Sequence, residues 1–346
     1  MPTFKTRRPT ARPMGLPAYD KGVLMVLSSI EALLAPGTLF FVLGAIAAAV
    51  RSDLAVPESV SRALALYLML CIGFRGGVEA RVHGLGGEML GVAVVGILLS
   101  FLTPLFVFLF VQRFGRLDRA TSAATAAAYG SVSVVTFAAA SEYLASIGIR
   151  PAGYMAAVLA LMETPAILTG LLIARRASGS APSATTPRTL HEVFFNGALL
   201  VLIGSFAIGL ITGERGMSRL ETFVTSIFQG ALCFFLLDMG LTAARSLQNG
   251  GGVRLRLVGL ALCTSLTGAS VALLAAFLLS LGVAEATLLM VLAGSASYIA
   301  VPAALRLALP EANTGVYVTL PLAVTFPFNL LVGIPLYFGA ASLLLG

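Results

Sequence analysis

The chain has 346 residues, of which 58% are hydrophobic and only 11% carry a charge. A water-soluble domain carries about 25% charged residues, and a mean hydropathy of +0.97 leaves more apolar side chains than one core can hold. The composition therefore excludes a soluble globular protein and predicts an all-α protein that crosses a lipid bilayer many times. The net charge of +7 does not indicate nucleic-acid binding, because the basic residues lie singly or in pairs between apolar stretches.

Ten predicted helices follow a basic, proline-containing tail over residues 1–22, which we expect to be disordered. Each crossing of a hydrocarbon core about 30 Å thick needs roughly 20 helical residues. A linker rich in Ala, Ser, Thr and Pro at 177–190 separates a first unit of five helices (23–176) from a second (191–346). The predicted helices cover residues 33–50, 58–74, 88–112, 120–140, 152–174, 193–212, 220–240, 255–281, 284–307 and 313–343.

Arginines in the connections predict the orientation. Leaving the tail out, the connections after the odd-numbered helices carry more than twice as many as those after the even-numbered ones, which include Arg75, Arg81 and Arg150. Basic connections stay in the cytoplasm. We therefore expect a bacterial inner-membrane protein with the 177–190 linker in the cytoplasm and both termini outside.

The two five-helix units resemble each other, which indicates an internal repeat. Alanine-rich runs inflate such matches, but four pairs in chain order are hard to ascribe to composition alone. An odd number of crossings places the second copy upside down, and inverted repeats are typical of secondary transporters with a substrate site at mid-membrane. The matched pairs are 72–81 with 236–245 and 130–140 with 294–304, both at an offset of 164, Pro165 with Pro327 at 162, and Gly44 with Gly204 at 160.

Short Gly/Ser stretches interrupt the fourth and ninth predicted helices, at Tyr129–Ser133 and at Gly294–Ser297. A broken helix in a membrane leaves unpaired N–H groups, which are tolerated only where they line a cavity or a ligand. Together with the helix dipole they form an anion site. Close packing of small residues would explain either stretch alone, but their recurrence at one offset favours a site. The candidate substrate-binding residues are Gly130, Ser131, Ser133, Thr136, Ser295 and Ser297.

Two carboxylates lie within apolar helices, Glu163 in METP and Asp238 in FFLLDMG. An ionisable side chain at membrane depth is costly, and its default interpretation is functional. We expect Glu163 and Asp238 to bind a coupling cation or relay a proton, with Thr164, Thr325 and Asn329 as further polar groups. The alternative for Asp238 is a place near the membrane surface or a pairing with an arginine. No cysteine–histidine spacing indicates a zinc site, so sodium is the one metal ion expected.

Six segments, in order along nearly the whole chain, resemble the sodium-dependent bicarbonate transporter family best known from cyanobacteria. They are VPESV (56–60), IGFRGGVEAR (72–81), GSVSVVTFAAA (130–140), METPAILTGLLIA (162–174), SASYIAVPAALRLALPEAN (295–313) and IPLYFG (334–339). The resemblance implies ten helices in core and gate domains, a homotrimer, and bicarbonate uptake driven by sodium. It places bicarbonate between the two interrupted helices and implies inhibition by a trimeric PII-like protein.

The chain departs from the cyanobacterial pattern at the second Ser-rich motif, where Tyr298 replaces an aspartate and Ala300 a small polar residue. Because the resemblance places the bicarbonate pocket at this motif, Tyr298 and Ala300 are also candidate substrate-binding residues. Val134 and Val135 also stand where those relatives carry Gly-Ser, and the linker is shorter. A proton- or sodium-coupled carrier of another small carboxylate or inorganic anion therefore remains an alternative. We expect no enzyme, because no paired catalytic aspartates, Ser–Lys dyad or metal triad occurs at helical spacing. A passive channel fits inverted broken helices less well than a carrier does.

Overall fold

The computed structural model describes residues 34–84, 86–177, 197–249, 254–299 and 311–346, together with Val301, Leu305 and Leu309. Within these residues all regular structure is helical. The predicted tail (1–22) and all but the first residue of the predicted linker (177–190) lie outside the described residues. The α-helices are α2 (Pro36–Ala49), α3 (Glu58–His83), α4 (Gly87–Phe110), α5 (Arg119–Gly130), α6 (Val134–Ser146), α7 (Met155–Ala177), α9 (Gly197–Glu221), α10 (Ile227–Asn249), α11 (Leu255–Leu278), α12 (Val283–Gly294), α14 (Thr314–Tyr317), α15 (Phe326–Phe328) and α16 (Ile334–Leu345). Short π-helical segments are η1 (Val111–Gly115), η2 (Thr222–Ser226), η3 (Pro321–Thr325) and η4 (Asn329–Gly333).

Six helical runs in the described residues are long and apolar enough to cross a membrane. The run Leu199–Gln248 contains a bend, because Gly213 has non-helical backbone angles. The chain is thus a multi-pass membrane protein, as its composition predicts, whereas the number of ten crossings stays a prediction. The other runs are Glu58–Val82, Gly87–Gly115, Arg119–Ser146, Leu255–Leu278 and Thr314–Leu345; shorter apolar helices cover Pro36–Ala49, Met155–Gly170 and Val283–Gly294.

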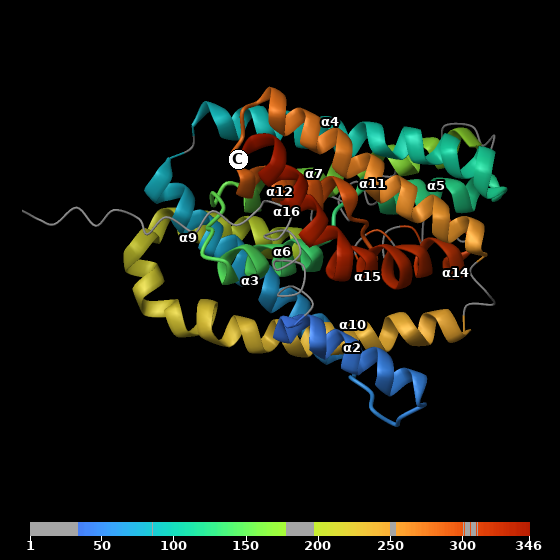
Figure 1. The fold of residues 1–346 in the computed structure, drawn as a ribbon, viewed down its shortest axis with the longest axis horizontal. Helices are drawn as coiled ribbons and strands as arrows, with labels where there is room; N and C mark the ends of the chain where they lie inside the picture. Colours follow the sequence, from blue (N-terminus) through green and yellow to red (C-terminus); the bar gives the residue numbers. More distant parts are fainter. Residues whose placement is uncertain are drawn as a thin grey trace, which may run out of the picture.

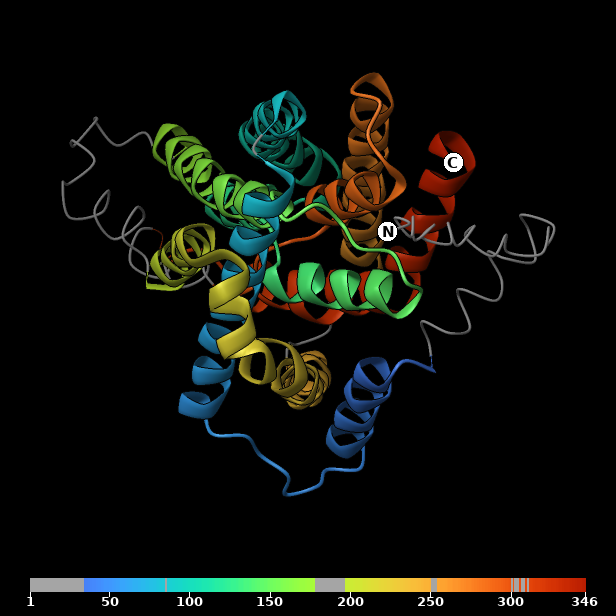
Figure 2. The same cartoon turned by 90° about the vertical axis from the view of Figure 1, so that its left-hand side faces the viewer.

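Two groups of helices make up the molecule (Figures 1 and 2). A four-helix group consists of α2 packed along α10 and α3 packed along α9. A central group contains α4 to α7, α11, α12 and the segments from α14 to α16, with α4, α5 and α7 against one another and α12 between α11 and α16. The span Arg119–Ser146 is buried throughout its most apolar window, which places the broken fourth helix inside the molecule.

Glycines hold the pairs of the four-helix group at backbone contact. A Cβ atom on Gly44 of α2 would overlap the carbonyl oxygen of Leu237, and one on Gly209 of α9 would overlap that of Phe74. Small residues allow this close approach in membranes. Gly204, which the repeat alignment pairs with Gly44, makes no such contact, because a Cβ on Gly204 meets nothing within 4 Å. In α9 the close contact is made by Gly209.

Helix α3 runs nine residues beyond the predicted end at residue 74 and reaches His83. The cluster of glycines there suggests a break in the sequence, but Gly77 packs against the carbonyl of Phe206 and Gly76 against Ala156. Tertiary packing thus overrides the low helix propensity of glycine. Arg75 and Arg81 consequently lie on a helix, not in a connection.

Candidate functional site

The first break in the central group lies between α5 and α6. Helix α5 ends at Gly130, and Ser131 has an extended backbone. Ser133 then caps α6: its Oγ accepts a hydrogen bond from the N–H of Thr136 at 3.2 Å and another from the Thr136 hydroxyl at 2.8 Å. The serine that was predicted as a ligand therefore also starts the resumed helix, as an N-cap residue does.

The second break follows α12, which ends at Gly294. Residues 295–297 are not helical, and the Ser295 hydroxyl donates to the carbonyl of Leu292 at 3.0 Å. Tyr298 is buried and packs its ring against Phe326, with centroids 5.4 Å apart. Ala300 lies outside the described residues.

The two breaks touch each other, although they lie far apart in the sequence. The N–H of Ser133 donates to Ser295 Oγ at 3.0 Å, and the N–H of Ser297 donates to the carbonyl of Ala128 at 2.8 Å. Figure 1 shows α5 and α12 approaching this region from opposite ends of the molecule. The structure therefore brings both predicted Ser clusters together, in the interior.

Two hydroxyls at this junction, those of Ser131 and Tyr298, have no hydrogen-bond partner among the described residues. Ser131 is 1% exposed. The neighbouring Tyr298 hydroxyl lies close to Ser133. Buried polar groups are nearly always paired. The unpaired Ser131 hydroxyl beside the start of α6 is therefore a candidate donor to a bound ligand.

Two serines that sequence analysis missed support the breaks from behind. Ser100 of α4 donates to the carbonyls of Gly130, at 3.2 Å, and Met162. Ser265 of α11 donates to the carbonyl of Gly294 at 2.5 Å. These contacts satisfy the last carbonyl group of α5 and of α12. The two serines are 165 residues apart, close to the repeat offset of 164, so extending the repeat alignment would have found them.

Two predicted cation-coupling residues brace the same junction. The side-chain amide of Asn329 donates to the carbonyl of Gly294 at 2.9 Å, and its oxygen accepts from Tyr337 at 2.9 Å. The hydroxyl of Thr325 is 2.6 Å from that of Tyr129, which precedes Gly130. Both side chains thus already have partners that hold the helix ends in place.

Glu163 on α7 is 3% exposed, and its Oε2 has no partner in the described part of the chain. Ala166, one turn further on, packs against the position of a Cβ on Gly130. The carboxylate therefore lies near the first break and retains an oxygen for a cation or a proton. The backbone of Thr164 continues α7, but its side chain is outside the described residues.

Asp238 lies in the four-helix group rather than at the breaks. It is 5% exposed, and its Oδ2 accepts a hydrogen bond from the hydroxyl of Ser61 on α3 at 2.5 Å. Arg245 and Tyr298 lie within electrostatic range of the carboxylate. Asp238 therefore faces the central group from across the boundary between the two groups, and its contact with Arg245 is electrostatic, without a direct ion pair.

The buried junction of two broken helices can be compared with known families. A model of the Na+-dependent bicarbonate transporter superfamily matches residues 36–342. The chain belongs to this superfamily. The resemblance found from the sequence motifs is thus confirmed, and the family is one of transporters, not of enzymes. No curated protein matches the chain.

Proposed function

We propose that the protein is a secondary active transporter that imports bicarbonate with sodium by alternating access across a bacterial inner membrane. The observation that carries this proposal is the pair of buried helix breaks in mutual contact, with the Ser131 hydroxyl unpaired between them. A carrier for a small anion needs donors at membrane depth, and an interrupted helix supplies them without a full positive charge.

Bicarbonate fits the chemistry of this junction. The ion is small and planar, and its negative charge is spread over oxygens that accept hydrogen bonds. The Ser131 hydroxyl and the first N–H groups of α6 (Val134–Ser146) are donors, because only the third N–H, that of Thr136, is taken by the Ser133 side chain. The positive end of the α6 dipole adds to the attraction of an anion. The proposed ligand set therefore comprises the Ser-rich residues of both breaks.

In this proposal the four-helix group is the gate domain and the central group is the core domain. Each contains helices from both inverted five-helix repeats. Reciprocal contacts support this symmetry: α2 packs on α10 as α9 packs on α3, with glycines at each crossing. Ser100 and Ser265 likewise make equivalent contacts to the ends of α5 and α12. Such equivalent contacts are expected when two copies of one unit face opposite sides of the membrane.

Sodium coupling is assigned to the region of Glu163. A hard cation prefers carboxylate and carbonyl oxygens, and the unpaired Oε2 of this side chain is the free acidic oxygen beside the first break. Binding of sodium there would offset the cost of burying the carboxylate. Thr325 and Asn329 enter the proposal as supports of the site rather than as direct ligands, because their polar atoms are already bonded.

The wider assembly follows from the resemblance and remains part of the proposal. We expect a homotrimer with the 177–190 linker in the cytoplasm, both termini outside, and inhibition by a PII-like protein on the cytoplasmic face. Native mass spectrometry of the purified protein measures the number of subunits directly. A monomer in a mild detergent and in lipid nanodiscs would contradict the trimer without affecting the transport proposal.

Uptake of labelled bicarbonate into proteoliposomes tests the function. An inward sodium gradient should accelerate uptake, which should saturate and show counterflow, as expected of a carrier. Potassium in place of sodium is the control for the membrane potential and ionic strength. Uptake that ignores sodium but follows a proton gradient, or that prefers another carboxylate or inorganic anion in competition, would contradict the proposal.

A further inference from the structure

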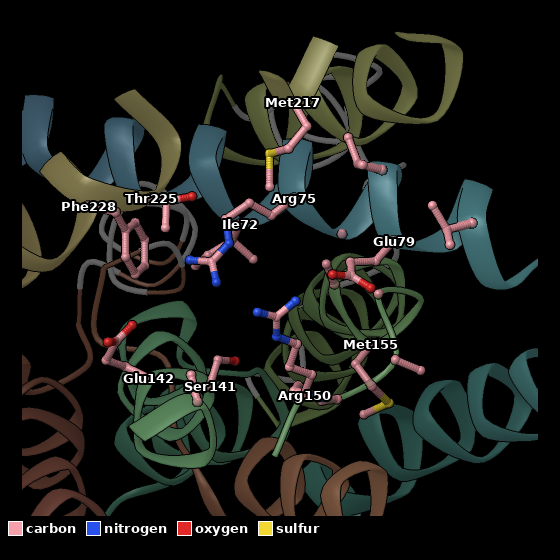
Figure 3. Close-up of a pocket in the computed structure, with 18 of the residues that line it drawn as sticks. Ile72, Arg75, Glu79, Ser141, Glu142, Arg150, Met155, Met217, Thr225 and Phe228 are labelled. Atoms are coloured by element: carbon pink, nitrogen blue, oxygen red, sulfur yellow. The ribbon is translucent and has the colours of Figure 1, made fainter. Parts of the chain in front are cut away.

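A cleft of about 730 Å³ lies between the two helix groups, apart from the serine junction (Figure 3). Its walls come from α3 and α9 of the four-helix group and from α6 and the segment before α7 of the central group. The lining includes Phe137, which directly follows Thr136 on α6. The cleft therefore reaches the first turn of the helix whose N-terminus faces the serine junction.

Two arginines face each other across this cleft. Figure 3 shows the guanidinium groups of Arg75, from α3, and Arg150, from the segment before α7, pointing toward each other near its centre. Arg75 is half-buried and lies over the ring of Phe228, 5.4 Å from its centroid. In the described part of the chain no ion pair joins either arginine to a carboxylate. Arg75 lies within the apolar run Glu58–Val82, and an ionised side chain inside a membrane-spanning helix is a functional candidate by default.

Carboxylates also line the cleft, on both helix groups. Glu142 accepts a hydrogen bond from the amide of Gln229 at 2.5 Å, and Glu79 has an interaction of its own. Glu214 and Glu221, on α9, are exposed. The lining as a whole has more acidic than basic side chains, so any anion selectivity must come from the facing guanidinium groups and not from net charge.

The segment that carries Arg150 is held in place at both sides. The N–H of Ala152 donates to Oε1 of Glu285 at 2.8 Å, and the hydroxyl of Tyr154 donates to Oε1 of Glu88 at 2.9 Å. Both acceptors belong to the central group, on α12 and α4. Arg150 thus extends from a fixed support toward Arg75 on the other group.

We propose that Arg75 and Arg150 form a second anion site, which binds one small planar oxyanion of the carboxylate or bicarbonate type between their guanidinium groups. A guanidinium presents paired N–H donors that match two oxygens of such an ion. Two facing cations repel each other, and an oxyanion between them replaces this repulsion with attraction from both sides. The ion would bridge the two helix groups inside the cleft that reaches α6. The existence of this site rests on the cleft alone, whereas its role in uptake rests on the proposed function.

Chemical modification tests for the site without relying on transport. Phenylglyoxal reacts with accessible guanidinium groups, and peptide mass spectrometry of the full-length protein measures the modification of each arginine. Sodium bicarbonate, compared with sodium chloride at equal pH and sodium concentration, should slow the modification of Arg75 and Arg150 about fivefold or more, since a bound ion occupies their N–H groups. Arg215, which is exposed on α9 and does not line the cleft, is the internal control.

The same protection should persist in Ser131→Ala, which alters only the serine junction. Equal modification in bicarbonate and chloride would overturn the second site. Protection that disappears in Ser131→Ala would also overturn it, because the effect would then arise from closure around the serine junction. Failure of sodium-driven uptake together with intact protection would refute the proposed function and leave this site standing.

Transport kinetics provide the second test. Arg150→Gln should raise the half-saturating bicarbonate concentration about tenfold, the usual effect of losing hydrogen bonds to a charged ligand, and Arg150→Lys should restore part of the loss. Arg150 is exposed, so the substitution leaves packing unchanged; Arg215→Gln is the matched control. Half-saturating concentrations that stay at the native value in both Arg75→Gln and Arg150→Gln overturn the proposal.

Discussion

Replacing Ser131 and Ser295 separately by alanine distinguishes a ligand-binding hydroxyl from one that holds the fold together. The Ser131 hydroxyl is buried without a partner, and an unsatisfied buried group costs about 1–3 kcal/mol. Ser131→Ala should therefore leave the bicarbonate-free protein at least as stable as the native one. Ser295 Oγ instead accepts the N–H of Ser133 at 3.0 Å. Ser295→Ala leaves that buried N–H unpaired and should destabilise the protein by about 1–3 kcal/mol.

Both substitutions should nevertheless weaken bicarbonate binding. A hydrogen bond to a charged group contributes about 1.5–3 kcal/mol, so Ser131→Ala should raise the half-saturating concentration about tenfold or more. Thermal unfolding of the purified protein, with bicarbonate absent and present, measures both effects in one experiment. Ser131→Ala should keep the native midpoint without bicarbonate and lose most of the rise on its addition. The reasoning is refuted if Ser131→Ala lowers the midpoint as much as Ser295→Ala does and binds bicarbonate with native affinity.

Three further outcomes follow from single contacts. Glu163→Gln keeps the size of a buried side chain that has one unpaired oxygen. The substitution should leave the unfolding midpoint near native and raise the half-saturating sodium concentration about tenfold or more. Uptake with native sodium dependence would contradict a sodium site at Glu163. Gly209→Ala puts a Cβ into the carbonyl of Phe74 and should cost about 1–3 kcal/mol, whereas Gly204→Ala, with open space around it, should leave the unfolding midpoint unchanged or higher. Asp118 lies just before α5, and although burial alone would raise its pKa, hydrogen bonds from Thr121 hold that pKa below its usual value. The stabilising effect of ionised Asp118 is therefore complete above about pH 3.9 and is lost as the pH falls through its lower pKa in the folded protein. Asp118→Asn should remove this pH dependence from the unfolding midpoint. If the unfolding midpoint of Asp118→Asn falls with acid as that of the native protein does, the cap has no such effect.

The parts of the molecule that the sequence predicts well are those set by local chemistry. Composition alone indicates a membrane protein, and the Gly/Ser stretches indicate the helix breaks within a residue or two of Ser131 and Ser295. Both predictions depend on properties of a short segment: how many charges it carries, and whether its backbone can leave the helical conformation. The contact between the breaks agrees with the predicted repeat, because equivalent segments of two inverted copies would meet near the middle of the membrane.

Features that depend on a partner far along the chain could not be predicted in this way. A glycine cluster is typical both of a helix end and of a close helix crossing, and only the presence of α9 decides that α3 continues past Gly76. The position of Arg75 in a cleft instead of a connection follows from that one decision. Asn329 shows the same limit, because an amide near a proline in an apolar helix resembles a cation ligand. Only the fold shows that its oxygen accepts a hydrogen bond from Tyr337 and that its N–H group donates to the carbonyl of Gly294.

The junction of the two breaks also explains why the fold and the site cannot be separated. Each break exposes an N–H group that its own half of the chain leaves unbonded: Ser133 uses a side chain from the second half, and Ser297 uses the carbonyl of Ala128 from the first. Either half alone would bury such a group at a cost of about 1–3 kcal/mol, in surroundings where water is scarce. Pairing of the halves removes this cost at Ser133 and Ser297. The hydroxyl of Ser131 still has no hydrogen-bond partner among the described residues. The polar groups that draw the two halves together are therefore neighbours of the donor that remains for an anion.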